Sequence, residues 1–426
     1  MKQIKIKGIE EVVYYEKLDN NLDVYIVSKT NRNSISISMT TKYGSKDLEF
    51  IPKGSTKFYK SPRGVAHFLE HKVFDTPNSK DIMDLFSKNG IMANAYTSSF
   101  QTTYHFNCVK DVEENVNALL DLVQSASFTD KLVEKEKGII EQEIKGGDDE
   151  PDFYLDMKLR ENLLLKHPFK YTVAGTVEDI KEITKEDLDK CYQTFYSPNN
   201  MFLIIVGNVD PEKIINSIKE NQSKKQFDNP EIKVKNIKEP LKVEKEYEEL
   251  RMAIEIPKFY LGIKIKEEEN LNVENKIKRE IYYRMFLALS FGLTSKFHEK
   301  MLENNYISYT IDATYINVDS FSTFFFSNES NEPKKVIEEI KNILKNIDIK
   351  EDDVERYKKI TKSNFIATFD NVDYIEDYLN YMNVYYGDIA PNYIDIIDSI
   401  TYKEFKKCIQ KIDFSISSEI IAFPKE

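Results

Sequence analysis

Residues 64–71 read Gly64-Val65-Ala66-His67-Phe68-Leu69-Glu70-His71, and two of the chain's five histidines stand four positions apart in this segment. Residues at i and i+4 lie on the same side of a helix, so His67 and His71 can turn their imidazole nitrogens toward one ion. Glu70 stands one turn after His67, where it can take a proton from water beside that ion. The order, with Glu before the second His, is the inverted form of the metalloprotease helix.

The residues around this motif predict a half-buried helix. Ser61 is a suitable N-cap and Pro62 suits the first helical position, so we expect a helix from about Pro62 to Val73. The residues between the polar positions of the motif are apolar or small, and buried imidazoles need partners such as a metal. The competing interpretation is a surface helix that carries two solvated histidines.

A catalytic zinc site needs a third protein ligand. The predicted helix from Thr129 to Lys145 contains four acids, Glu134, Glu136, Glu141 and Glu143. Glu136 and Glu143 are seven positions apart and therefore share a helix face. Spacing alone does not choose among the four acids, and all of them are equally compatible with a solvated surface.

The bulk properties are typical of a folded protein with more than one domain. The 426 residues exceed one ordinary core, and 41% of them are hydrophobic while 31% are charged. A net charge of -12 argues against nucleic acid as a partner. The three cysteines are odd in number and far apart, and no segment predicts a signal peptide or a membrane span. We therefore expect a cytoplasmic protein without a membrane partner.

Two homologous halves are predicted from the pattern along the chain. Ile183-Thr184, Lys190-Cys191 and Gln193 recur at the same spacing as Ile400-Thr401, Lys407-Cys408 and Gln410, each time ahead of an apolar strand. A polar segment with two prolines separates the halves. We expect an α+β fold in which each domain is a mostly antiparallel sheet with helices packed on one face. The predicted divisions are a zinc-binding N-terminal domain (1–220), a linker (221–248) and a C-terminal homologous domain without the metal motif (249–426).

The sequence resembles the pitrilysin/insulinase metallopeptidases, which include the mitochondrial processing peptidases, and within them the zinc-motif chains of two-chain bacterial members. The resemblance covers almost the whole chain. It rests on residues 64–71, Asn94-Ala95-Tyr96-Thr97, Glu136 to Ile144 and Ser197-Pro198-Asn199-Asn200. It implies Zn²⁺ held by His67, His71 and Glu143, with Glu136 as a supporting acid. It also implies that Asn94, Ala95, Tyr96 and Thr97 form an edge strand that binds the substrate peptide by main-chain pairing.

The chain departs from the family at one position of its C-terminal half. The resemblance implies a catalytic Arg and Tyr seven residues apart, which hold the substrate and stabilise the oxyanion. Tyr309 matches the tyrosine, but Leu302 stands where the arginine is expected. This difference predicts that a sister chain of the same family supplies the pair, in a homo- or heterodimer.

The function expected from the motif and the resemblance is that of a zinc-dependent endopeptidase subunit. Glu70 is the expected catalytic base, and the expected substrates are short or unfolded peptides taken into a closed chamber. The alternative is a non-catalytic or accessory zinc-binding subunit that acts in peptide binding or peptide maturation. Zinc storage is a weaker interpretation, because the motif supplies a base as well as ligands.

Overall fold

The computed structural model describes residues 1–75, 79–268 and 270–425. The strands are β1 (Lys2–Ile6), β2 (Glu11–Lys17), β3 (Asp23–Ser28), β4 (Ile35–Thr41), β5 (Glu49–Phe50), β6 (Tyr59–Lys60), β7 (Asn94–Thr97), β8 (Thr102–Cys108), β9 (Met201–Gly207), β10 (Tyr247–Met252), β11 (Lys258–Lys266), β12 (Asp312–Val318), β13 (Phe321–Glu329) and β14 (Ser417–Pro424). The helices are α1 (Val65–Phe74), α2 (Ser79–Lys88), α3 (Val112–Gln124), α4 (Asp130–Asp148), α5 (Pro151–Leu163), α6 (Val177–Glu182), α7 (Lys185–Phe195), α8 (Pro211–Ser223), α9 (Val273–Phe291), α10 (Lys296–Glu303), α11 (Pro333–Lys345), α12 (Glu351–Thr368), α13 (Val372–Tyr386), α14 (Tyr393–Asp398) and α15 (Tyr402–Gln410).

The chain packs as two compact units, and each unit includes a segment from the other half of the sequence. The first unit comprises residues 1–145, 172–236 and 365–393, and the second comprises 146–171, 237–364 and 394–426. Helix α13 therefore belongs to the first unit, and helix α5 belongs to the second. The division predicted from the sequence is contiguous along the chain, whereas the compact units are not.

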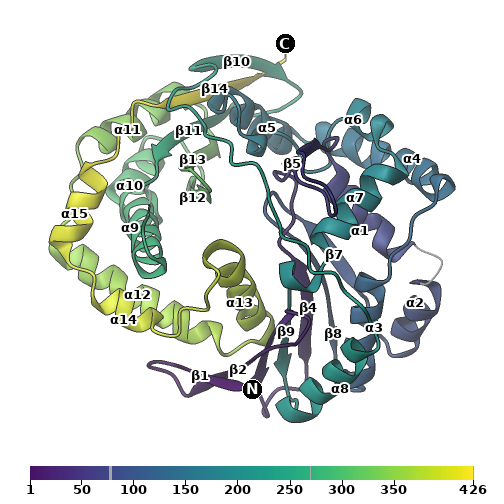
Figure 1. Ribbon diagram of the computed structural model, residues 1–426. Coiled ribbons are helices and arrows are strands. Elements are labelled where there is room, and N and C mark those ends of the chain that lie inside the picture. Colours follow the sequence, from purple (N-terminus) through teal and green to yellow (C-terminus); the bar gives the residue numbers. More distant parts are fainter. Residues whose placement is uncertain (76–78, 269, 426) are drawn as a thin grey trace. The chain divides into compact units, whose positions relative to one another are not determined.

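The first unit is built on a sheet with the strand order β1-β2-β3-β9-β4-β8-β7. All neighbouring pairs are antiparallel except β3 and β9, which are parallel. Ile35, Ile37 and Met39 of β4 point into the apolar core beneath α3, because successive side chains of a strand alternate between its faces. Helix α13 packs on β4 and β9 (Figure 1), and Ser38 and Thr40 of β4 hydrogen-bond to it, so this face of the strand is polar. The predicted α+β sheet is confirmed, with one helix added on its second face.

The second unit repeats this architecture. Its sheet has the order β10-β14-β11-β13-β12, and only β10 and β14 are parallel. This order matches β3-β9-β4-β8-β7 strand for strand, and the helices between the strands also correspond, so that α5 and α13 are equivalent. Helix α5 packs on β11 and β14, as α13 packs on β4 and β9. The repeated sequence pattern has the same structural meaning in both halves, because Thr184 caps α7 and Thr401 caps α15.

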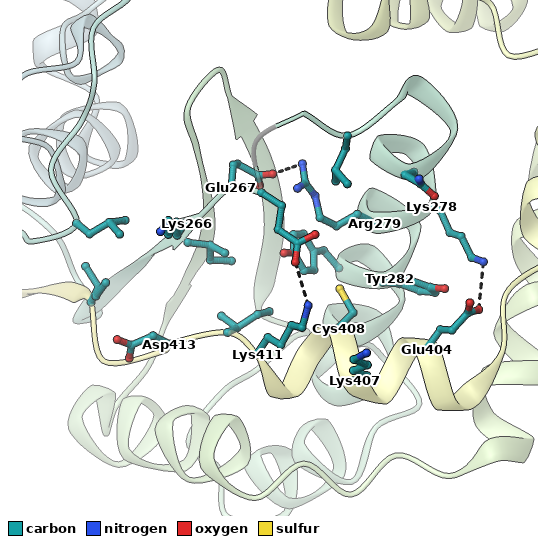
Figure 2. Close-up of a pocket in the computed structure, with 18 residues that line it drawn as sticks. Lys266, Glu267, Lys278, Arg279, Tyr282, Glu404, Lys407, Cys408, Lys411 and Asp413 are labelled. Atoms are coloured by element: carbon teal, nitrogen blue, oxygen red, sulfur yellow. Dashed lines mark hydrogen bonds and ion pairs between the residues drawn. The ribbon is translucent and has the colours of Figure 1, made fainter.

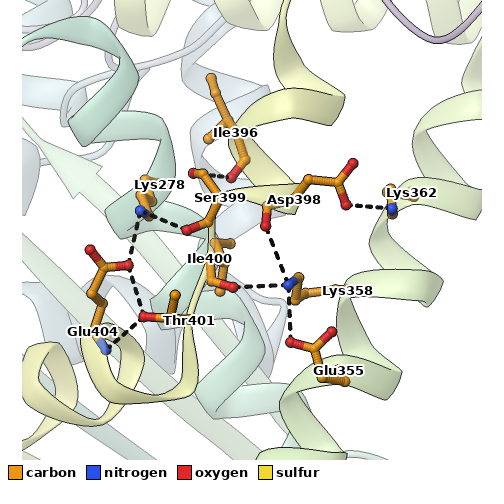
Figure 3. A network of polar contacts seen from close by, with 10 residues as sticks. All are labelled: Lys278, Glu355, Lys358, Lys362, Ile396, Asp398, Ser399, Ile400, Thr401 and Glu404. Atoms are coloured by element: carbon orange, nitrogen blue, oxygen red, sulfur yellow. Dashed lines mark hydrogen bonds and ion pairs between the residues drawn. The ribbon is translucent and has the colours of Figure 1, made fainter.

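Two lysines fix an irregular segment of the second unit. Lys358 of α12 donates to the carbonyl oxygen of Ile400 at 2.9 Å and pairs with Glu355 at 3.0 Å (Figure 3). Lys278 of α9 donates to the carbonyl oxygen of Ser399 at 3.2 Å, so the α14–α15 connection is held from two helices. Carbonyl groups outside helices and sheets are satisfied in this way.

The segment between α8 and β10 is attached to both units in turn. In the middle of this segment, the backbone N–H of Lys235 donates to the carbonyl oxygen of Glu49 at 2.8 Å. Further along, Glu239 pairs with Lys264 of β11 at 2.8 Å, and neither side chain is exposed to solvent. Glu239 also accepts three backbone N–H groups from residues 165–167, which leaves its charge fully hydrogen-bonded. The predicted linker (221–248) overlaps the end of α8 and the start of β10.

Candidate metal site

Helix α1 carries the histidine motif and begins at Val65. The predicted start at Pro62 is wrong, because Ser61 does not cap the helix: its hydroxyl and its backbone N–H both donate to the carbonyl oxygen of Leu48. The N-cap is Gly64, whose φ is 86°. A Cβ at this position would lie 2.3 Å from the carbonyl oxygen of Ala174, so glycine is required by both conformation and space.

The two motif histidines and Glu143 of α4 converge on one point. Nε2 of His67 lies 3.4 Å from Oε1 of Glu143, and Nε2 of His71 lies 3.5 Å from Oε2 of the same carboxylate. Ligands bound at about 2.0 to 2.1 Å around a tetrahedral zinc ion would be roughly 3.3 Å apart. Within the described residues, these three side chains form the one cluster whose spacing suits a metal ion. Two imidazoles and a carboxylate are also the kinds of ligand that zinc accepts.

Glu136 of α4 orients the second histidine. Its Oε1 lies 3.0 Å from Nδ1 of His71, and its Oε2 accepts from Nζ of Lys72 at 2.9 Å. The hydrogen bond to His71, with the charge of Lys72, lowers the pKa of Glu136 to about 2. The same hydrogen bond raises the pKa of His71. An ionised Glu136 assigns the proton to Nδ1 of His71 and leaves the lone pair of Nε2 free for a metal.

Helix α4 separates the four candidate acids by face. Glu136 and Glu143 point toward α1, whereas Glu134 pairs with Lys137 at 2.6 Å and Glu141 pairs with Lys145 at 2.7 Å on the exposed side of the same helix. Sequence spacing had left all four open. Lys72 was missed: its side chain is fully buried, and its position directly after the motif on a half-buried helix was the available signal.

Glu70 is hydrogen-bonded to strand β7. Oγ1 of Thr97 donates to Oε2 of Glu70 at 2.6 Å. Strand β7, which contains the four predicted substrate-binding residues Asn94, Ala95, Tyr96 and Thr97, is the last strand of its sheet and pairs with β8 alone. Its second backbone edge is therefore not paired within the sheet, which is the property that strand addition requires.

Tyr309 and Leu302 belong to the second unit. The side chains are exposed there, with 51% of Tyr309 and 38% of Leu302 accessible to solvent. The main-chain carbonyl of Tyr309 accepts from Asn328 at 3.0 Å. A catalytic role for Tyr309 stays a prediction.

The second unit also contains a cavity of about 1050 Å³ among β11, α9 and α15. Arg279 forms an ion pair with Glu267 in its wall, and Lys411 pairs with Glu268 at 3.1 Å (Figure 2). Cys408 projects toward the same space from α15. None of the residues that line this cavity is among those predicted for the metal site or the substrate strand.

Comparison with known proteins agrees with this geometry. Residues 48–177 match the family described as insulinase (peptidase family M16), and residues 182–361 match the peptidase M16 inactive domain. The uncharacterized zinc protease YmfH of Bacillus subtilis (strain 168) is 37% identical to the chain, over 96% of both proteins. The chain belongs to peptidase family M16. The resemblance found in its sequence is thereby confirmed.

Two other family members extend the comparison. The crystal structure of a putative M16-like peptidase from Alicyclobacillus acidocaldarius superposes with a TM-score of 0.92 at 28% identity, and covers 99% of this chain and 100% of its own. The mitochondrial-processing peptidase subunit beta of Caenorhabditis elegans is 32% identical over 39% of this chain and 37% of that protein. Among the described residues, no helix of this M16 protein has both the length and the apolar composition needed to cross a bilayer.

Proposed function

We propose that this M16 protein is a zinc-dependent endopeptidase subunit that cleaves short or unfolded peptides. The observation that carries the proposal is the convergence of His67, His71 and Glu143, whose spacing suits one zinc ion. The names of related proteins, including the uncharacterized zinc protease YmfH, support the choice of metal. Bound zinc would polarise the scissile carbonyl and make a neighbouring water acidic.

The other steps of the proposed reaction are assigned to residues of the protein. His67, His71 and Glu143 would hold the metal, and Glu136 keeps the ring of His71 in the required orientation. Glu70 would accept the proton of the attacking water and return it to the leaving amine. The hydrogen bond from Thr97 leaves Oε1 of Glu70 available for this proton. Strand β7 would hold the substrate main chain beside Glu70 by strand addition.

The test compares wild-type protein with Glu70→Gln. The amide keeps the size of the carboxylate but cannot take up a proton, so we expect zinc content to stay unchanged and peptide cleavage to fall by at least about 100-fold. Zinc is measured by mass spectrometry and cleavage with casein-derived peptides, with and without a sister chain. Equal cleavage by wild-type protein and Glu70→Gln would exclude the endopeptidase.

A second candidate function is that of an accessory zinc-binding subunit in peptide binding or maturation. It is favoured by Leu302, which stands where the family resemblance implies an arginine. In that case a sister chain would carry the catalytic Arg and Tyr, or cleavage would not occur at all. Leu302→Arg separates the two: it should raise cleavage by the isolated chain if Tyr309 serves catalysis here, and should change nothing if the chain only binds.

The partner and the compartment are parts of the same proposal. We expect a homo- or heterodimer with a chain of the same family, because a substrate-binding arginine is missing from this one. A cytoplasmic location fits three free cysteines, two of them buried. Size-exclusion chromatography with light scattering, on the chain alone and with its sister chain, measures the assembly.

A further inference from the structure

Strand β7 is held from both faces of its sheet. Thr97 points toward α1 and donates to Oε2 of Glu70 at 2.6 Å. Tyr96 points to the opposite face, because neighbouring side chains of a strand alternate. There Nε2 of Gln101 donates to the hydroxyl oxygen of Tyr96 at 3.0 Å. The strand proposed to bind substrate is thus fixed on one side by the candidate base and on the other by a buried amide.

Gln101 connects Tyr96 to helix α13. Its Nε2 also donates to Oδ1 of Asn380 at 2.7 Å, and only 7% of Gln101 and 3% of Asn380 are exposed. Nδ2 of Asn380 donates in turn to Oγ1 of Thr40 on β4 at 2.9 Å. A continuous chain of hydrogen bonds therefore runs from buried Asn380 of α13 through buried Gln101 to Tyr96 of β7, whose side chain is partly exposed.

The series of hydrogen bonds starts at Glu376, one turn before Asn380 on α13. Its carboxylate accepts the hydroxyl of Ser38 and lies 3.4 Å from Nδ2 of Asn380. The helix is consequently fixed in rotation and in position along β4. A helix held only by apolar contacts has no such directional constraint, because the hydrophobic effect is non-directional.

The polar character of this interface needs a physical reason. Buried polar groups gain little net free energy from their hydrogen bonds, and each one left unpaired destabilises the folded state. The equivalent helix α5 packs on its sheet through three completely buried leucines and buries a single polar side chain, Asn162, so a mainly apolar solution is available to this fold. The polar contacts instead fix the orientation of the side chains that they join. The last side chain in this series is Tyr96.

We propose that Gln101 and Asn380 are positioning residues for peptide binding. They do not touch the substrate. They hold the side chain of Tyr96, and through it the backbone of β7, in the register that strand addition requires. The inference rests on the proposed function, and it gives α13 a role in substrate binding although this helix lies far along the sequence from the metal motif.

The test uses Asn380→Leu, with Asn383→Leu as the matched control. Asn383 lies on the same helix and is also 3% exposed, but it donates to the carbonyl oxygen of Leu379 within α13 and is hydrogen-bonded to Tyr25 of β3, not to Gln101. Asn380→Leu should raise KM for casein-derived peptides about 5- to 20-fold, with kcat within about twofold of the wild type. Asn383→Leu should lower thermal stability to a similar degree and leave KM unchanged.

Gln101→Met is a second variant, in case Asn380→Leu does not fold. It should raise KM by a similar factor, and the double variant should do no more than either single change, because both residues act through one chain of hydrogen bonds. Equal KM changes in the Asn380 and Asn383 variants, or none in Gln101→Met, would overturn the positioning role.

A measurement of peptide binding distinguishes a failure of this inference from a failure of the proposed function. In a Glu70→Gln background, the Kd of a fluorescein-labelled casein peptide should rise by the same factor when Asn380→Leu is added. If wild-type protein cleaves nothing but this Kd still depends on Asn380, the peptidase proposal fails and the positioning role stands. If wild-type protein cleaves but neither KM nor Kd responds, the positioning role alone is wrong. An absence of any peptide binding would overturn both.

Discussion

Helices α5 and α13 occupy equivalent places in the two repeated halves, yet they are packed in different ways. The residues that α5 buries completely are Leu155, Leu159 and Leu163. Helix α13 also buries apolar residues, but it buries three polar side chains, Glu376, Asn380 and Asn383, whereas α5 buries one, Asn162. Each helix packs on the two corresponding strands of its own unit: α5 on β11 and β14, and α13 on β4 and β9.

The different packing of α5 and α13 suggests that one helix mainly stabilises its unit, whereas the other mainly fixes the geometry of its neighbours. Leucines stabilise a unit in proportion to the apolar area they bury, and many arrangements of them serve equally well. Hydrogen-bonded amides contribute less but specify one arrangement. The polar helix lies in the unit that holds the histidine motif and the edge strand β7, where an arrangement matters for chemistry. Changes in α5 should therefore affect folding alone, and changes among the buried acids of the first unit should affect function and pH dependence.

The largest effect is expected from Leu159→Ala in α5. Removing a fully buried leucine side chain leaves a cavity beside Gly262 and should lower the free energy of unfolding of the second unit by about 3 kcal/mol. Amide hydrogen exchange of β11 and β14 measures this loss directly. Zinc content should remain unchanged, because His67, His71 and Glu143 all belong to the first unit.

Tyr154→Ala is the control on the same helix. Tyr154 is 38% exposed, so its removal should change exchange in β11 by less than about 1 kcal/mol. If Leu159→Ala lowered zinc content as much as stability, the division between the two helices would be wrong.

A smaller effect is expected from Glu136→Gln on α4. The amide still contacts His71 but no longer carries the charge that fixes its Nδ1 proton and neutralises buried Lys72. Changes of this kind next to a ligand weaken metal binding by about 10- to 100-fold, or about 2 kcal/mol. Competition with a chelator measures the zinc affinity.

Glu134→Gln provides the comparison within α4. Glu134 is exposed and pairs only with Lys137 at 2.6 Å on the far side of the helix, so zinc affinity should not change. Equal losses for the two variants would mean that the total charge of α4, and not the contact with His71, sets the affinity.

How much of this could be predicted from the sequence depends on the range of the interaction. The helix with His67 and His71 and the common face of Glu136 and Glu143 follow from local periodicity, whereas the strand Asn94–Thr97 follows from the family resemblance. The start of α1 could not be predicted locally. Ser61 is bound to Leu48, and Gly64 is required by a contact with Ala174.

The part that could not be predicted involves the longest separations in the chain. Asn380 stands far beyond the strand β9 that ends the first half, and no periodic signal places α13 on β4. A buried Asn or Glu also looks like any surface residue when only its neighbours in sequence are known. Gln101 and Asn380 were therefore absent from the residues proposed from the sequence, whereas their neighbour Tyr96 was included through the family resemblance.

The smallest effect, and the sharpest test of the polar interface, is expected from Glu376→Gln. Burial raises the pKa of Glu376 to about 7 from 4.5. A carboxyl whose pKa is raised by folding stabilises the folded state fully at low pH, and this contribution is lost as the pH rises from about 4.5 through 7. The amide stays neutral throughout, so the variant should gain about 1.7 kcal/mol over the wild type between pH 5 and pH 6.5. Thermal unfolding at the two pH values measures the gain.

The difference in stability between the wild type and Glu376→Gln reports on Glu376 alone, because the other titratable groups around this position are the same in both. These are Asp373 and Asp377 on α13, and Tyr96 and His105 on the sheet. Glu338→Gln on the exposed face of α11 is the control, and it should show no gain at either pH. If Glu376→Gln lost stability at pH 6.5 relative to the wild type, the carboxylate would be stabilising α13 as an ion. The polar interface would then derive its strength from charge and not from the neutral hydrogen bonds that reach Tyr96.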